Sequence, residues 1–252
     1  MIDILISAFL LSLVLLGIHS FYGLEIIKRG IIFTDLAIGQ MAALGAAISI
    51  FFFHGSFLYP ISLSFALLGG IIIAFASKKT ETLEAFIGLL YAFGLSAIFI
   101  ILSKSYHGME EFQRLMASDI LFTPFEEIAK TAIIYAGIGI VLFVLYRKTT
   151  GFLKDAVFFV TFAVTVTSSV KLAGVLIVFA LLVSPALIAM KIKKGIPLIN
   201  AWIIGTIINL LSIIVSYNFD LPTGYTLVFC NALCALSAVI IHRKNKTKIP
   251  AS

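Results

Sequence analysis

Long apolar stretches separated by short polar segments run through the chain. Those near residues 1–27, 31–53, 57–76, 85–103 and 128–146 each match the ~20 residues that a helix needs to cross a bilayer. The first has no basic segment before it and no small-x-small cleavage site after it, so we expect a membrane helix and not a cleaved signal peptide. The pattern predicts an all-α, polytopic integral membrane protein.

The stretch 155–190 is short for the crossings it must supply, because a pair of crossings needs about 40 residues. Lys154 and Lys191 at its two ends are both expected in the cytoplasm, which requires an even number of crossings. We expect two short or broken helices that meet near residues 168–171, with their backbone buried in protein or lining a cavity. Counting these, nine helices form a single permease domain over residues 1–252.

Basic residues give the orientation. Fourteen of the 18 fall into five clusters: Lys28 and Arg29; Lys78 and Lys79; Arg147, Lys148 and Lys154; Lys191, Lys193 and Lys194; and Arg243, Lys244, Lys246 and Lys248. If all five are cytoplasmic, the chain threads a cell (inner) membrane with its N-terminus outside and its C-terminus inside.

Composition supports this class. Hydrophobic residues make up 61% and charged residues 12% of the 252, with a mean hydropathy of +1.15, whereas soluble domains carry about 25% charged residues. The net charge of +6 follows from the cytoplasmic bias, so we expect no nucleic-acid partner. No Gly-rich loop followed by Lys-Ser/Thr is present, so any ATPase that drives transport is a separate polypeptide.

Asp35 is an acid near the start of the second apolar stretch. Retaining a charge inside a membrane costs about 3 kcal/mol, and such an acid usually faces a partner or a water-filled path, so transport of a cation is the leading hypothesis. Asp35, Gly39, Ala42 or Ala43, and Ala46 form a strip of small residues at helical spacing, which lets neighbouring helices approach. The alternative is a packing seam in which Asp35 pairs with Lys28, Arg29 or another basic group near the cytoplasmic end. Gln40 lies about 140° around the helix from Asp35 and shares a ligand with it only if the helix is distorted.

These residues resemble a family. The likeness runs in order through residues 28–45, Glu84–Ala92, His107–Glu110 with Ser118–Leu121, Val166–Leu176, Ser184–Ala189 and Asp220–Gly224. Together these blocks are similar to the permease subunits of metal-ion (zinc, manganese and iron) ABC importers. The resemblance implies a type II importer-like permease that is not an enzyme and has no cofactor of its own. It also implies a homodimer, cytoplasmic ATP-binding subunits and an extracytoplasmic metal-binding protein.

In such importers the acid that matches Asp35 belongs to the metal pathway. Family members often carry His one turn later, where this chain has Gly39 and Gln40. Oxygen ligands at Asp35 and Gln40 favour manganese slightly over zinc, since imidazole suits zinc better.

Two further positions depart from the family pattern. Family members carry a segment like Ser-Phe-Asp-Pro-Glu-x-Ala and a short helix that docks into the ATPase, where this chain has only residues 146–155. Lys171 stands where the family commonly has Gln. Its ammonium either modifies the pathway, by repelling a dication or replacing one, or extends toward the outer headgroups.

The expected outer loops hold further candidate ligands. His107, Glu110 and Asp220 can pass a dication from a docked protein into the pore, although scattered acidic loop residues are usually solvated surface. The segment Asp220–Gly224 predicts a turn in which Asp caps, Pro fixes φ and Gly takes positive φ.

Three hypotheses follow, in order of preference. The first is the permease of a divalent-metal ABC importer. The second is an uncoupled carrier or channel descended from one, favoured by the short 146–155 loop and Lys171. The third, an intramembrane enzyme or structural subunit, lacks a paired catalytic motif in the sequence.

Overall fold

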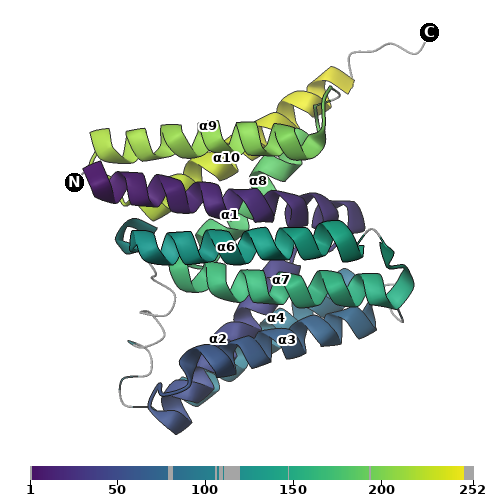
Figure 1. Ribbon diagram of the computed structural model, residues 1–252, viewed down its shortest axis with the longest axis vertical. Helices are drawn as coiled ribbons and strands as arrows, with labels where there is room; N and C mark the ends of the chain where they lie inside the picture. The colour runs from purple at the N-terminus through teal and green to yellow at the C-terminus, as the bar shows by residue number, and fades with distance from the viewer. Residues whose placement is uncertain are drawn as a thin grey trace. The chain divides into compact units, whose positions relative to one another are not determined.

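The computed structural model is all-helical in the parts that it describes (Figure 1). It describes residues 2–78, 82–105, 107, 110, 120–146, 148–192 and 194–246, with the side chains of Ile2 and of residues 242–246 left aside. Within these ranges nine α-helices occur, and eight helical segments are long and apolar enough to cross a membrane. The ninth, α8 (Val175–Ala189), is apolar but has only 15 residues. The predicted fold class is confirmed.

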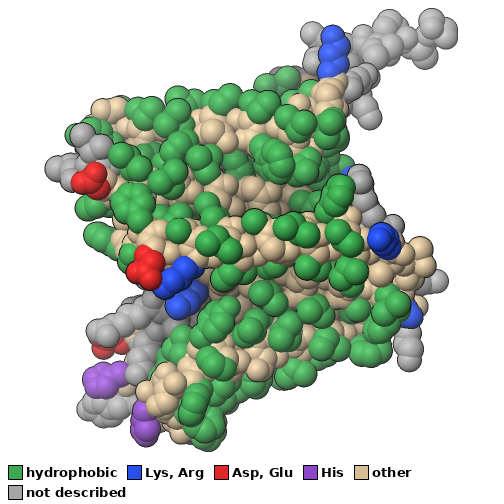
Figure 2. All heavy atoms as spheres, viewed as in Figure 1, with side chains coloured by type: hydrophobic (Ala, Val, Ile, Leu, Met, Phe, Trp, Pro, Cys, Tyr) green, Lys and Arg blue, Asp and Glu red, His purple; other side chains and the backbone are tan. Residues whose placement is uncertain are grey.

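The chain divides into two compact units. The first comprises residues 1–29, 119–128 and 176–252, and the second comprises residues 30–118 and 129–175. Large apolar side chains such as Ile100, Ile133 and Phe229 are exposed, and Figure 2 shows hydrophobic side chains over most of the visible helix surface. A soluble protein rarely exposes apolar patches of this extent, whereas lipid tails cover them without cost.

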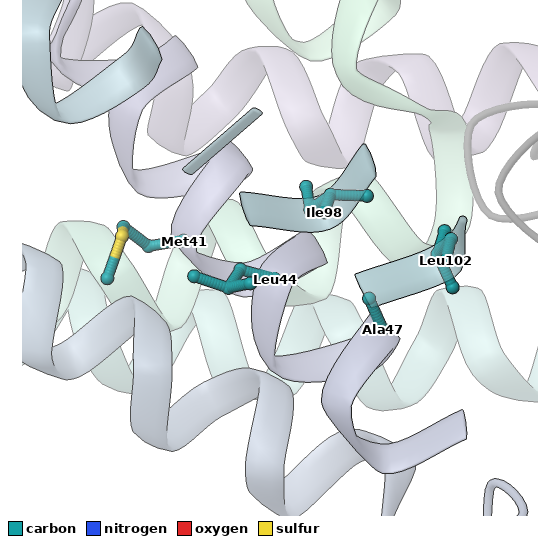
Figure 3. Packing of buried hydrophobic residues seen from close by; sticks show 5 residues of the cluster. All are labelled: Met41, Leu44, Ala47, Ile98 and Leu102. Atoms are coloured by element: carbon teal, nitrogen blue, oxygen red, sulfur yellow. The ribbon is translucent and has the colours of Figure 1, made fainter. Parts of the chain in front are cut away.

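The second unit is built around α2 (Thr34–Phe53), which packs against α3 (Leu58–Ala76), α4 (Leu83–Leu102) and α7 (Gly151–Ala173). The unit also contains most of α6 (Phe125–Val141) and the π-helical turn η2 (Leu142–Tyr146). One buried apolar cluster joins α2 to α4 (Figure 3); its members are Met41, Leu44, Ala47, Ile98 and Leu102.

The first unit contains α1 (Ile2–Arg29), the short 3-10 turn η1 (Ile120–Phe122), nearly all of α8, α9 (Pro197–Asn218) and α10 (Thr223–Lys246). Helix α9 packs against both α1 and α10. The indole N–H of Trp202 donates to the carbonyl of Gly17 at 3.0 Å, which ties α9 to α1. Helix α9 begins with Pro197. Proline has no backbone N–H, but it loses no hydrogen bond here, because an N–H in the first turn has no partner within the helix.

The helices α7 and α8 correct the expectation for 155–190. Helix α7 is a full-length span of 23 residues and passes straight through residues 168–171, so no turn occurs at Lys171. The chain breaks at Gly174 instead, with φ 83° and ψ 159°, a conformation that is essentially restricted to glycine. Only α8 is short. Helix α7 gains its length because Gly151–Lys154, expected in the loop, form its first turn.

A second correction concerns the turn before α10. Asp220 adopts the positive φ of 51°, and Gly224, which we expected to do so, already lies within α10. Aspartate tolerates this region better than most residues because its short side chain bonds locally. The turn itself is confirmed, since the N–H of Leu221 bonds to the carbonyl of Ser216 at 2.9 Å.

Candidate functional site

The candidate site lies in the first turn of α2, where Asp35 is the second helical residue. The turn is started by Thr34, whose hydroxyl donates to the carbonyl of Ile31 at 2.7 Å, and continued by the bond from the Ala37 N–H to the Phe33 carbonyl at 3.0 Å. Asp35 is 1% exposed. An acid in the first turn is favoured by the positive end of the helix dipole.

Within the described part of the chain, neither carboxylate oxygen of Asp35 has a hydrogen-bond partner. Of the basic residues considered as partners of Asp35, Lys28 makes an ion pair within its own helix, with its ammonium 3.0 Å from Glu25. Buried polar atoms are nearly always bonded in native proteins, and an exception calls for an explanation. An oxygen pair held without a protein donor is suited to receive a cation.

The small residues of α2 pack differently from the prediction. Helix α3 approaches most closely at Gly45, where a Cβ would lie 2.6 Å from the carbonyl oxygen of Ile61, and Gly45 is not in the predicted strip. The nearest atom to a Cβ built on Gly39 is a methyl carbon of Val166 in α7, at 4.0 Å. The close approach at Gly45 thus lies outside the strip that Asp35 heads, although Ala42 of the strip accepts a hydrogen bond from the Ser62 hydroxyl of α3.

Gln40 lies on another face of α2. A Cβ built on Gly94 of α4 would stand 3.1 Å from the Cβ of Gln40, so α4 closes directly onto this residue. Gln40 is 3% exposed, and its side-chain oxygen has no hydrogen-bond partner in the described residues. Because α2 is one continuous helix from Thr34 to Phe53, Asp35 and Gln40 remain about 140° apart. A role for Gln40 as a ligand stays a prediction.

The candidates for the outer mouth are only partly brought together. The ring nitrogen Nδ1 of His107 lies 3.7 Å from Glu110 Oε2, and both side chains are well exposed. Asp220 is exposed in the turn before α10. Among the described residues no three His, Cys, Asp or Glu side chains could hold a metal ion together. The loop residues Glu111 and Asp119 lie outside the described residues.

Lys171 lies in the last turn of α7 and is exposed. Its ammonium is 5.6 Å from the centre of the Tyr59 ring at the start of α3. A cation over an aromatic face is stabilised at a membrane boundary, where rings and long basic side chains gather. This contact supports the interfacial alternative for Lys171.

The connection after η2 is even shorter than the sequence suggests. Only residues 147–150 separate Tyr146 from Gly151, the first residue of α7. The ammonium of Lys154 lies 4.5 Å from the Tyr146 ring, so the first turn of α7 folds back onto the end of η2. Of these four residues the described ones, 148–150, are too few for a docking helix of the usual kind.

Comparison with known proteins agrees with the fold and the motifs. Residues 150–242, from the start of α7 into α10, match the ABC 3 transport family. The matched segment covers less than half of the chain. This part of the chain is thus similar to a family of transporters, in agreement with the resemblance carried by the sequence motifs.

Two uncharacterized membrane proteins are similar to this chain over most of its length. An uncharacterized membrane protein from the ycf23-apcF intergenic region of Cyanophora paradoxa is 27% identical over 247 residues, which cover 86% of this chain and 82% of the relative. The uncharacterized membrane protein slr2045 of Synechocystis is 26% identical over 208 residues, covering 75% and 72%.

Two solved structures share the fold of this chain. PsaBC from Streptococcus pneumoniae, solved in complex with a Fab, superposes with a TM-score of 0.72 at 18% identity and covers 92% of this chain and 89% of its own. An inward-facing transporter described as a metal-chelate type ABC transporter gives 0.68 at 16% identity, covering 94% and 85%. At these identities the two similarities show a shared fold and no more.

Sequence reasoning missed one residue of this site. Glu84, in the first turn of α4, accepts the backbone N–H of Phe33 at 3.2 Å, two residues before Asp35. In the sequence, Glu84 is visible only as an acid at the start of an apolar stretch. Its bond to Phe33, 51 residues away, cannot be predicted from local spacing.

Proposed function

We propose that this chain is the permease subunit of an ABC importer for a divalent metal ion and that Asp35 is a ligand of the translocation path. The observation that supports this most is a carboxylate buried in a membrane-length helix, with both oxygens unbonded among the described residues. An ionisable side chain is costly to keep inside a membrane, and those that occur there usually serve a function. The match of residues 150–242 to the ABC 3 transport family supports a role in transport.

The chemistry of the donors favours a hard or borderline dication. Asp35 supplies carboxylate oxygens, and Gln40, if it takes part in the path, supplies an amide oxygen on another face. Oxygen ligands suit manganese better than zinc, and iron is intermediate. We therefore propose manganese as the first cargo to test, with zinc and iron as alternatives, and no resident cofactor.

The proposed assembly has several parts. Two copies of the permease pair in the cytoplasmic membrane, each with its N-terminus outside and its C-terminus inside, and cytoplasmic ATPase subunits drive them. An extracytoplasmic binding protein delivers the metal to the outer loops, where His107, Glu110 and Asp220 are the candidate first contacts. The likeness to PsaBC and to a metal-chelate type ABC transporter supports this arrangement.

The test is metal uptake by the chain expressed with the products of its neighbouring genes. We expect Asp35→Asn, which keeps the shape and removes the charge, to lower manganese uptake about tenfold or more, equivalent to at least about 1.4 kcal/mol. Asp3→Asn is the matched control, because Asp3 is an exposed acid in the first turn of α1 with no place in the proposed path and should leave uptake close to wild type. Uptake by Asp35→Asn at the wild-type rate would contradict the proposal.

An uncoupled carrier is a second candidate, favoured by the short connection at residues 147–150. Co-purification in detergent and transport in vesicles separate the two functions. If an ATPase stays bound and uptake stops when ATP is depleted, the importer is supported. If no ATPase binds and the purified chain passes manganese without ATP, the uncoupled carrier takes its place.

A further inference from the structure

Helix α2 begins without a cap of its own. The N-cap position is Phe33, whose side chain can accept no hydrogen bond, and α2 has no side-chain cap bond there. The first N–H groups of a helix have no partner within the helix, and an apolar N-cap leaves them unsatisfied. Asp35 therefore stands in a first turn to which the N-cap side chain adds no hydrogen bond.

Glu84 supplies the missing cap from another helix. Its Oε1 accepts the Phe33 N–H at 3.2 Å, which is the bond that the acid of a capping box makes to the N-cap residue. In a capping box that acid lies three residues into the same helix, whereas here it comes from α4. The second oxygen, Oε2, is buried and has no partner among the described residues, so the bond to Phe33 is the contact that this carboxylate makes.

The segment before α2 depends on this bond. Gly30 has a φ of 68°, a backbone conformation that glycine adopts readily, and open space where a Cβ would be. Beyond Gly30, the chain is fixed by the bonds from Thr34 to the Ile31 carbonyl and by the bond from Phe33 to Glu84. Of these contacts, the Glu84 bond is the one that ties the start of α2 to a neighbouring helix.

We propose that Glu84 is a positioning residue that holds the first turn of α2 against α4 and thereby sets the place of Asp35. It acts through a hydrogen bond to the backbone and not by binding the cargo. The expected effect of Glu84 on transport rests on the proposed function. Its expected effect on the first turn of α2 does not. It predicts that an acceptor is required at residue 84 and that a negative charge is not.

The experiment compares Glu84→Gln, Glu84→Ala and wild type in the full chain. Hydrogen exchange of the amides in residues 31–37, followed by mass spectrometry in detergent, reports the first turn directly. We expect Glu84→Ala to speed exchange there by about fivefold, the effect of losing a helix cap, and Glu84→Gln to exchange like wild type because its amide oxygen still accepts. Glu126→Ala, an exposed acid in the first turn of α6, is the matched control and should leave 31–37 unchanged.

Manganese uptake is the second readout. Glu84→Ala should raise the KM by about fivefold or more, and Glu84→Gln should restore it. If Glu84→Gln exchanges normally but transports as poorly as Glu84→Ala, the charge of Glu84 matters and the positioning role is overturned. Unchanged exchange in Glu84→Ala would overturn it as well. Failure of Asp35→Asn to affect uptake would remove the transport proposal while leaving the exchange result intact.

Discussion

The side-chain amide of Asn231 donates from Nδ2 to Oδ1 of Asn209 at 3.0 Å and so joins α10 to α9. Both residues are fully buried, and the same Nδ2 also donates to the Leu227 carbonyl of α10. A polar pair between apolar helices fixes their register, because a shifted register would leave both amides without partners in hydrocarbon.

This pair gives a first prediction. Replacing Asn231 by Leu should lower the free energy of unfolding in detergent by about 1–2 kcal/mol, since Asn209 then loses its donor. The double variant Asn209→Leu with Asn231→Leu should recover part of this loss, because no buried amide is left unpaired. A double-mutant cycle of thermal unfolding measures the coupling, and additive losses would show that the bond contributes nothing.

The close approach of α2 and α3 gives a second prediction. A Cβ on Gly45 would lie 2.6 Å from the backbone oxygen of Ile61 and 2.8 Å from the Cα of Ser62, so the helices must move apart to accept it. We expect Gly45→Ala to destabilise the chain by about 1–3 kcal/mol. Gly88→Ala is the matched control in α4, where a Cβ meets nothing within 4 Å; helix propensity should make it neutral or slightly stabilising.

A third prediction concerns the hydroxyl cluster between α6 and α7. The Tyr135 hydroxyl bonds to the hydroxyls of Ser168, at 2.9 Å, and of Ser169. Tyr135→Phe should lower the free energy of unfolding by only about 0.5–1.5 kcal/mol, since both serines keep their bonds to carbonyls of the preceding turn. Thermal unfolding of this variant and of Ser169→Ala measures the effect; a loss well above that range would mean that the cluster organises more than these bonds.

Lys171 gives a fourth prediction. Because its ammonium lies over the Tyr59 ring and is exposed, we expect an interfacial role and no control of the cargo. Lys171→Arg and Lys171→Gln should therefore both keep the manganese KM close to that of wild type. A markedly lower KM in Lys171→Gln, with Lys171→Arg unchanged, would instead show that the positive charge repels the cation.

The membrane helices were predictable because length and apolar composition suffice to define them. The boundary between α7 and α8 was not. Ser168, Ser169 and Lys171 are polar and suggested a reversal, but the two hydroxyls bond to carbonyls one turn earlier, so the helix continues past them. The actual break at Gly174 depends on the backbone conformation of this one residue, which the apolar sequence around it does not predict.

Part of the candidate site could be read from the sequence. Asp35 stood out as an acid within an apolar stretch, and in the structure it is buried. Gln40 and Asp35 were expected on different faces of one helix, which the unbroken α2 supports. The contact of Glu84 with Phe33 and the pair of Asn209 with Asn231 depend on which helices become neighbours, and a single sequence contains no direct record of that.

The four-residue connection at residues 147–150 also constrains how the chain is made. With so little chain between Tyr146 and Gly151, the helices on either side must run in opposite directions, and η2 indeed contacts α7. Neither helix can then be released into the lipid long before the other, so the insertion machinery must accept them as a hairpin. A reporter or protease site placed at 147–150 would separate two segments that enter the membrane together, and it should reduce the yield of inserted protein more than the same insertion at the C-terminus.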